Sequence, residues 1–193
     1  MLDFLKNGQG EILNLMFSNP DKRYYLAEIA KILGKEPANY QRYIEKMISD
    51  GIFCEERIGN MRFFWLNKNY QLYDEIKGII SKTIGVEAQL REIVNKIDTI
   101  EVAFIFGSFA TDKFNSQSDI DLFIIGEVNN DNFIEEITKL ETQISRDINY
   151  HIYRKQDVMD KLAAKHDFIN NIFSNKMILL KGNTDEFRKF NPV

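Results

Sequence analysis

Two β-prone runs joined by a polar loop limit the folds open to this sequence more than any other segment. The first run, IEVAFIF, covers residues 100–106 and leads directly into Gly107-Ser108. Ten residues separate Ser108 from the second run, DIDLFIIG, which covers residues 119–126. β-Branched and aromatic residues favour strands. The pattern therefore predicts two buried strands, with a Gly-Ser pair at the end of one and two carboxylates at the start of the other.

The two carboxylates and the Gly-Ser pair indicate a site for a phosphate and a metal. Side chains alternate along a strand, so Asp119 and Asp121 emerge on the same face. Like charges this close raise each other's pKa unless a cation lies between them, and carboxylate oxygens suit a hard metal such as Mg²⁺. Gly107 lets the backbone approach a ligand, and its N–H groups with the Ser108 hydroxyl can hold phosphate oxygens. Nucleotide chemistry is the expected outcome.

The rest of the second half alternates helical and strand-like periodicity. Helices are predicted at residues 86–97, 131–146, 156–164 and 167–174, and further strands at 148–153 and 176–182. The predicted fold class is α+β, with a short mixed sheet flanked by helices in this half.

The segment IFGSFATDKFNSQSDIDLFIIG resembles the signature of the nucleotidyltransferase superfamily of DNA polymerase beta, in its minimal nucleotidyltransferase branch. The resemblance covers roughly residues 86–155. It implies that Asp119 and Asp121 bind two Mg²⁺ ions and that Gly107 and Ser108 grip the triphosphate of an NTP, ATP or GTP. An acceptor hydroxyl would attack the α-phosphorus and release pyrophosphate. Transfer of a nucleoside monophosphate is the reaction implied.

The sequence departs from the family pattern at two places. A third carboxylate usually lies on the next strand, but Asn149 occupies this catalytic position. An amide oxygen can bind a metal but adds no charge and cannot accept a proton, so turnover is expected to be weak or absent unless Asp147 substitutes. Thr111-Asp112 stands where many members have Arg-Gly, which removes a cation from the triphosphate site. His151, on the predicted face of Asn149, is either a nucleotide contact or an ordinary polar strand residue.

The first half resembles a winged helix-turn-helix domain over about residues 8–68. Gly34, Pro37 and the pair Asp50-Gly51 mark helix boundaries. Gly59-Asn60 is a two-residue hairpin turn. Three helices followed by a hairpin are predicted, at residues 8–19, 25–33, 35–51, 52–58 and 61–67.

Six polar side chains of this half are candidates for DNA binding: Asn39, Gln41, Arg42 and Lys46 on the third helix, and Arg57 and Arg62 beside the hairpin turn. Asn, Gln and Arg can contact base edges, and the hairpin arginines can reach phosphates. Glu36 and Glu45 share this surface and nearly cancel its charge, which leaves a protein-interacting wing as the alternative. If DNA is bound, a homodimer reading two half-sites is expected. The helix predicted in the connector is either a dimer element or packs on its own transferase domain.

Composition excludes several further classes of protein. The net charge of −4 is not that of a strongly basic nucleic-acid-binding protein. One cysteine allows no internal disulfide, and two histidines provide no zinc cluster. No apolar run is long enough for a membrane helix, and MLDFLKNGQGEI does not resemble a signal peptide. A cytoplasmic protein without a membrane partner is expected.

The sequence therefore predicts a winged helix-turn-helix domain at residues 1–68, a helical connector at 69–85 and a minimal nucleotidyltransferase domain at 86–193. The first functional hypothesis is a Mg²⁺-dependent nucleotidyltransferase with an unknown acceptor. The second is a DNA-binding transcriptional regulator with a catalytically degenerate, nucleotide-sensing transferase domain. The third, from the resemblance, is an antitoxin whose protein partner is a small helical toxin.

Overall fold

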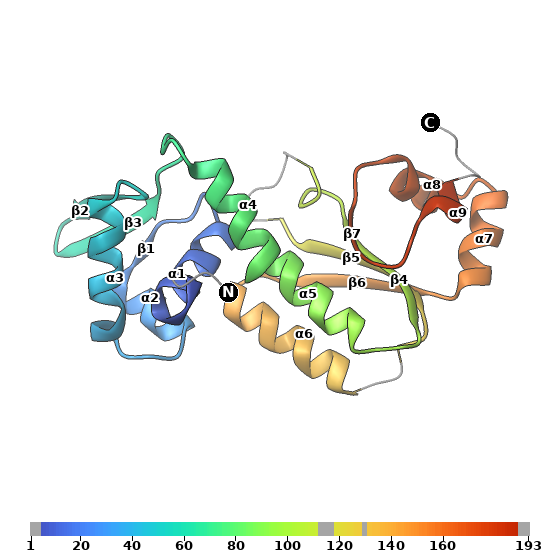
Figure 1. Cartoon of the computed structure of the whole chain (residues 1–193), viewed down its shortest axis with the longest axis horizontal. Helices are drawn as coiled ribbons and strands as arrows, with labels where there is room; N and C mark the ends of the chain where they lie inside the picture. The colour runs from blue at the N-terminus through green and yellow to red at the C-terminus, as the bar shows by residue number, and fades with distance from the viewer. Residues whose placement is uncertain (1–4, 112–117, 129–130, 189–193) are drawn as a thin grey trace. The chain divides into compact units, whose positions relative to one another are not determined.

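A computed structural model describes residues 5–111, 118–128 and 131–188. The chain divides into two compact units, residues 1–88 with 142–145 and residues 89–141 with 146–193. Figure 1 shows their helices and strands. Within the described ranges, no helix combines the length and apolar character needed to cross a bilayer.

The first unit contains helices around a small antiparallel sheet with strand order β1-β3-β2. β2 and β3 form a hairpin around Gly59-Asn60, where Gly59 has a φ of 61°. The predicted hairpin is therefore present. In chain order the elements are α1 (Asn7–Ser18), β1 (Tyr24–Tyr25), α2 (Leu26–Ile32), α3 (Pro37–Ser49), β2 (Phe53–Ile58), β3 (Met61–Leu66) and α4 (Tyr73–Thr83), followed by α5 (Val86–Asn95), which continues into the second unit.

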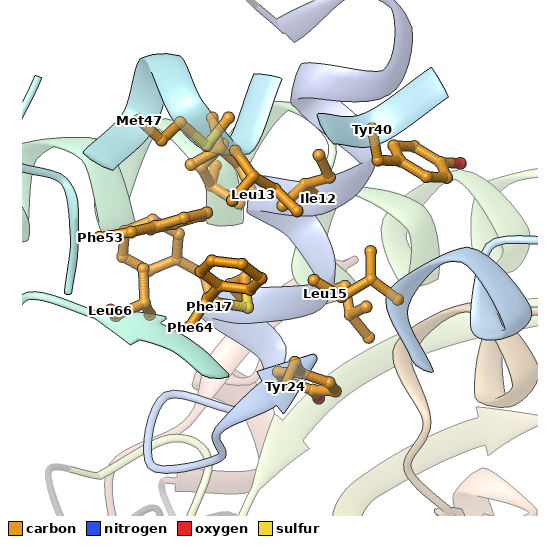
Figure 2. Packing of buried hydrophobic residues seen from close by; sticks show 14 of the residues in the cluster. Ile12, Leu13, Leu15, Phe17, Tyr24, Tyr40, Met47, Phe53, Phe64 and Leu66 are labelled. Carbon is orange, nitrogen blue, oxygen red and sulfur yellow. The ribbon is translucent and has the colours of Figure 1, made fainter. Parts of the chain in front are cut away.

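Helix α1 lies at the centre of the first unit's core, as Figure 2 shows. Ile12, Leu15 and Met16 are buried, as their helical spacing predicts, and Leu13 and Phe17 are buried as well. A helix that buries residues on most of its circumference must be covered from several sides. The covering residues come from α3 and the hairpin: Tyr40, Ile44, Met47, Phe53, Phe64 and Leu66.

The start of the second helix and the environment of the connector differ from what the sequence predicts. Tyr24 and Tyr25 form strand β1 opposite Phe64 and Phe63, so α2 begins one residue later than expected, at Leu26. Pairing with the hairpin edge overrides the local helical pattern there. In the connector, α4 packs on the first unit's own core, because Ile80 is buried and the Tyr73 ring lies 5.5 Å from that of Phe17.

The second unit is built on a four-stranded mixed sheet with strand order β6-β5-β4-β7. β5 and β6 run parallel, whereas β4 is antiparallel to both β5 and β7. This confirms the α+β class and the mixed sheet. The elements are β4 (Ile100–Phe106), β5 (Ile120–Gly126), α6 (Asp131–Ile144), β6 (Ile148–Tyr153), α7 (Lys155–Ala163), α8 (Asp167–Ser174), β7 (Ile178–Lys181) and the short helix α9 (Asp185–Arg188), which the sequence pattern did not indicate.

Helices contact both faces of this sheet. On one face, Phe104 of β4 and Phe123 of β5 stack with a ring separation of 5.1 Å. They share a buried core with Val158, Leu162, Ile169, Ile172, Phe173 and Phe187 of α7, α8 and α9. On the other face, the Tyr150 ring of β6 lies 5.3 Å from Phe133 of α6. The face carrying Phe104 and Phe123 is the one that also carries the candidate site.

Candidate active site

The two aspartates stand at the beginning of β5, on the face predicted for them. Ile120 between them is fully buried, whereas Asp119 is exposed and Asp121 is half-buried. Asp121 lies in register with Phe106 at the end of β4 and with Asn149 near the start of β6. Strand β5, which lies between β6 and β4, thus brings together the end of β4, both carboxylates and Asn149.

Gly107 is required by the approach of Asp121. Its φ is 71°, a left-handed conformation that side chains other than glycine rarely adopt. A Cβ atom at position 107 would overlap Asp121 Oδ2. The backbone turn at the end of β4 therefore lies directly against the carboxylate, whereas the close approach expected from the sequence is to a bound ligand.

Thr111 closes the turn that contains Ser108. Its backbone N–H donates to the Ser108 carbonyl oxygen at 3.2 Å, and its hydroxyl donates to the same oxygen at 3.1 Å. From the sequence, Thr111 is notable only because Thr111-Asp112 stands where many family members have Arg-Gly. Its role in the turn is missed, although Ser/Thr hydroxyls commonly bind nearby backbone groups in turns. Asp112, the next residue of the Thr111-Asp112 pair, lies outside the described residues.

Asn149 interacts with Asp119 as a hydrogen-bond donor. Its Nδ2 donates to Asp119 Oδ2 at 2.9 Å, an interaction that a carboxylate at position 149 could not make. Asp147 lies one residue before β6 and is exposed. Among the described residues, no three acidic, histidine or cysteine side chains form a metal-binding group, so Asp147 does not complete a carboxylate triad.

The electrostatics of Asp121 reflect a crowded, partly desolvated carboxylate. Burial raises the pKa of Asp121 above its ordinary value, nearby His151 acts in the opposite direction, and the charge of Asp119 raises it further. A divalent cation would relieve this repulsion. Two carboxylates with an amide oxygen are hard donors, so the site fits a metal of that class, with less negative charge than three carboxylates would provide.

His151 follows Asn149 on the same face of β6 and belongs to an aromatic group beside the carboxylates. Its ring lies 5.9 Å from Phe106 and 5.3 Å from Phe168 of α8. Sequence reasoning identifies His151 but misses Phe106 and Phe168. Phe106 could have been found from its position at the end of a predicted strand, directly before Gly107. No local sequence pattern connects Phe168 to this site.

The six candidate DNA-binding residues lie on a helix and a hairpin of the first unit. Asn39, Gln41, Arg42 and Lys46 are on α3, and all four are exposed. Arg57 and Arg62 lie opposite each other on β2 and β3. The candidate cations are therefore distributed over three elements.

Arg62 and Lys46 already have acidic partners. Arg62 forms a two-pronged ion pair with Glu45 of α3 and a further one with Glu55 of β2. Hydrogen bonding to these carboxylates raises the pKa of Arg62 further and lowers that of Glu45. Lys46 pairs with Asp50 one turn along the helix, at 2.9 Å. Contact with phosphate would compete with these ion pairs.

Comparison with known proteins identifies the second unit. The family model described as polymerase beta, nucleotidyltransferase matches residues 88–185, just over half of the 193-residue chain. No curated protein matches the sequence.

Several solved structures are distantly similar. A toxin–antitoxin complex with AMP-PNP is 18% identical with a TM-score of 0.38, over 54% of this chain and 80% of that chain. A tri-AMPylated Shewanella oneidensis HEPN toxin with MNT antitoxin is 14% identical with a TM-score of 0.33, over 54% of this chain and 76% of that chain. A nucleotidyltransferase-like protein from Sulfolobus solfataricus is 16% identical with a TM-score of 0.27, over 48% and 73%. These similarities are too distant to transfer a function, whereas the family match spans the two aspartates and the Gly-Ser turn. The chain belongs to the polymerase beta nucleotidyltransferase family.

Proposed function

We propose that the second unit is a Mg²⁺-dependent nucleotidyltransferase that moves a nucleoside monophosphate from ATP or GTP to an acceptor hydroxyl. The observation that carries the proposal is the position of Asp119 and Asp121 on one face, directly beside the Gly107-Ser108 turn. This arrangement puts anionic metal ligands next to backbone N–H groups that can bind phosphate.

In this reaction the chain's own residues align the reactants. Gly107 and Ser108 hold the triphosphate, and Asp119 and Asp121 hold the metal, with the Asn149 amide beside them. Mg²⁺ bound there would neutralise charge on the α-phosphate and on the leaving group. The acceptor oxygen bonds to the α-phosphorus as the bond to the bridging oxygen breaks, and pyrophosphate leaves. Asn149 cannot accept the acceptor's proton, which passes to solvent.

A nucleotide-sensing domain without turnover is the second candidate. Asn149 favours it, because the site lacks the carboxylate that would add charge and take a proton. Both candidates need a working nucleotide pocket, so binding is tested before turnover.

Calorimetric titration with ATP and GTP, with and without Mg²⁺, tests the shared step. We expect Mg²⁺-dependent binding that is lost in Asp119→Asn/Asp121→Asn. Asp157→Asn, an exposed carboxylate on α7, serves as the control and should bind as the wild type does. Transfer of label from α-labelled ATP then separates enzyme from sensor. Absence of Mg²⁺-dependent binding would overturn both candidates.

We also propose that the first unit is a winged helix-turn-helix that binds double-stranded DNA as a homodimer. The order helix, strand, helix, helix, hairpin supports the fold, with α3 as recognition helix and the β2–β3 hairpin as wing. Exposure of Asn39, Gln41 and Arg42 on this helix supports base contacts. The ion pairs of Arg62 with Glu45 and Glu55 weaken the case for phosphate contact from the wing.

Salt-dependent DNA binding tests this proposal. Removing one phosphate contact should reduce the log–log salt slope by roughly 0.9. Arg42→Ala/Lys46→Ala should therefore flatten the slope, whereas Arg62→Ala should change it less because its charge is already neutralised. Equal binding by wild type and the double variant would point to a protein partner instead.

A protein partner, including a small helical toxin, is the remaining proposal and follows from the resemblance to minimal nucleotidyltransferases. Purification from the native host, followed by incubation with α-labelled ATP, tests it. A co-purifying protein that becomes labelled would identify both partner and acceptor. Purification of the chain by itself, with no labelled protein, would count against it.

A further inference from the structure

We propose that Phe168 and His151 form a stacking surface for the nucleobase of the bound nucleotide, an inference that rests on the proposed nucleotide site. Phe168 is the second residue of α8, and its side chain is 38% exposed. The same helix buries Ile169, Ile172 and Phe173 in the core. Phe168 is thus the large apolar side chain that α8 leaves accessible.

The ring group adjoins the carboxylates through the strand register. Phe106 is the register partner of Asp121, and Gly107 follows it directly. His151 lies two residues beyond Asn149 on the same face of β6 and is close enough to Asp121 to affect its charge. A nucleotide whose phosphates lie at Gly107 and Asp121 therefore has its sugar and base within reach of these rings.

The geometry of the rings leaves faces for a further aromatic group. Phe106, His151 and Phe168 meet at 5.3 to 6.3 Å with interplanar angles between 53° and 80°. Deeper in the same core, Phe123 instead stacks face to face on Phe104 and Tyr153, at 16° and 14°. Edge-on contacts cover fewer ring faces than stacked contacts do. The exposed Phe168 ring is therefore suited to accept a base on its face.

The chemistry of such a surface predicts its ligand. Every nucleobase has a π-face, so an aromatic surface binds bases with little discrimination among them. We expect this surface to strengthen the binding of ATP, GTP, CTP and UTP alike. Inorganic tripolyphosphate, which keeps the phosphates but has no base, should not.

Calorimetry with Mg²⁺ and either ATP or tripolyphosphate tests the proposal. Phe168→Leu keeps apolar volume without an aromatic face and should weaken ATP binding by roughly 5- to 150-fold. Phe168→Tyr keeps the ring and should bind as the wild type does. Ile152→Ala, equally exposed at 38% but on the opposite face of β6, is the control and should have no effect. Tripolyphosphate affinity should be the same in all four proteins.

The outcomes separate this inference from the proposed function. If the wild type binds ATP and tripolyphosphate equally well, or if Phe168→Leu binds ATP like the wild type, the stacking surface is wrong while the nucleotide site stands. If Phe168→Leu loses both ligands in parallel, the residue supports the fold and the proposal is also overturned. If the wild type binds neither ligand, the proposed function fails and the inference fails with it.

Discussion

Gly107 and Asn149 are the residues whose exact chemistry shapes the candidate site. Gly107 makes room for Asp121 at the end of β4, and Asn149 donates a hydrogen bond to Asp119 from β6. One acts through the lack of a side chain and the other through the lack of a charge. Both consequences are measurable in single variants.

Replacing Gly107 by alanine should damage the site more than the fold. The left-handed backbone alone costs an alanine about 1–2 kcal/mol, and the added Cβ must also displace the Asp121 carboxylate. Gly34→Ala is the matched control, because Gly34 has a φ of 68° with no atom near its would-be Cβ. Urea unfolding should show a similar loss in both variants, with Mg²⁺-dependent nucleotide binding abolished only in Gly107→Ala. Retained binding in that variant would mean that Asp121 is not needed in its observed position.

Replacing Asn149 by aspartate should make the stability of the protein depend on Mg²⁺. The variant loses the hydrogen bond to Asp119 and puts a third negative charge beside two others, so the metal-free protein should lose about 1 kcal/mol of stability. Mg²⁺ should raise its melting temperature more than that of the wild type, and nucleotidyl transfer should increase. Asn149→Ala loses only the hydrogen bond and should show no added response to Mg²⁺. Equal Mg²⁺ responses in all three proteins would argue against a cation between these side chains.

At the scale of elements, polar contacts fix how helices of the first unit pack. Tyr40 of α3 is buried and its hydroxyl donates to Glu11 Oε2 of α1 at 2.6 Å. Lys35 pairs with the other oxygen of Glu11. Burial and the Glu11 carboxylate raise the pKa of the Tyr40 hydroxyl well above its ordinary value. The α1–α3 contact therefore holds this tyrosine in its neutral form.

Alkaline unfolding should reveal that contact. Because the folded-state pKa of Tyr40 is raised, its contribution to stability is complete below about pH 10 and is lost as the pH rises above it. Tyr40→Phe should be destabilised by roughly 1–2 kcal/mol at pH 7, since Glu11 loses a partner. The wild type's advantage over Tyr40→Phe should then shrink as the pH rises past about 10 in urea titrations. A constant difference across that range would contradict the raised pKa.

For the molecule as a whole, the described residues form a hydrophobic core in each unit and one candidate nucleotide site in the second. In the first unit the core forms around α1. In the second unit a buried cluster lies between the mixed sheet and α7, α8 and α9, and Phe133 of α6 is buried against the opposite face of the sheet. The two aspartates belong to the second unit, whereas the single tryptophan, Trp65, lies on β3 of the first. Unfolding of the two units can thus be followed with different probes.

Nucleotide should stabilise the second unit selectively. Ligand at a hundredfold excess over its Kd adds about 2.7 kcal/mol to the free energy of unfolding of the state that binds it. With Mg²⁺ and ATP we expect scanning calorimetry to show one transition moving upward, while the Trp65 fluorescence transition moves little. Asp119→Asn/Asp121→Asn should remove the shift. Equal movement of both probes would show that the two units unfold as one.

Local sequence patterns are sufficient to predict the features that depend on neighbouring residues. Alternation around Ile120 places Asp119 and Asp121 on one face, Gly59-Asn60 turns the hairpin, and helical spacing buries Ile12 and Met16. These patterns can be read locally because strand and helix geometry repeats every two or 3.6 residues.

Interactions between distant segments depend instead on tertiary packing. Pairing with β3 turns Tyr24 and Tyr25 into a strand, Glu45 and Glu55 neutralise the charge of Arg62, and α8 brings Phe168 to His151. No local period relates these partners, because their meeting depends on how strands align and helices pack across the core. The motif that carries the family's chemistry can therefore be recognised in a short stretch of sequence. The residues that surround the site are brought there only by tertiary packing.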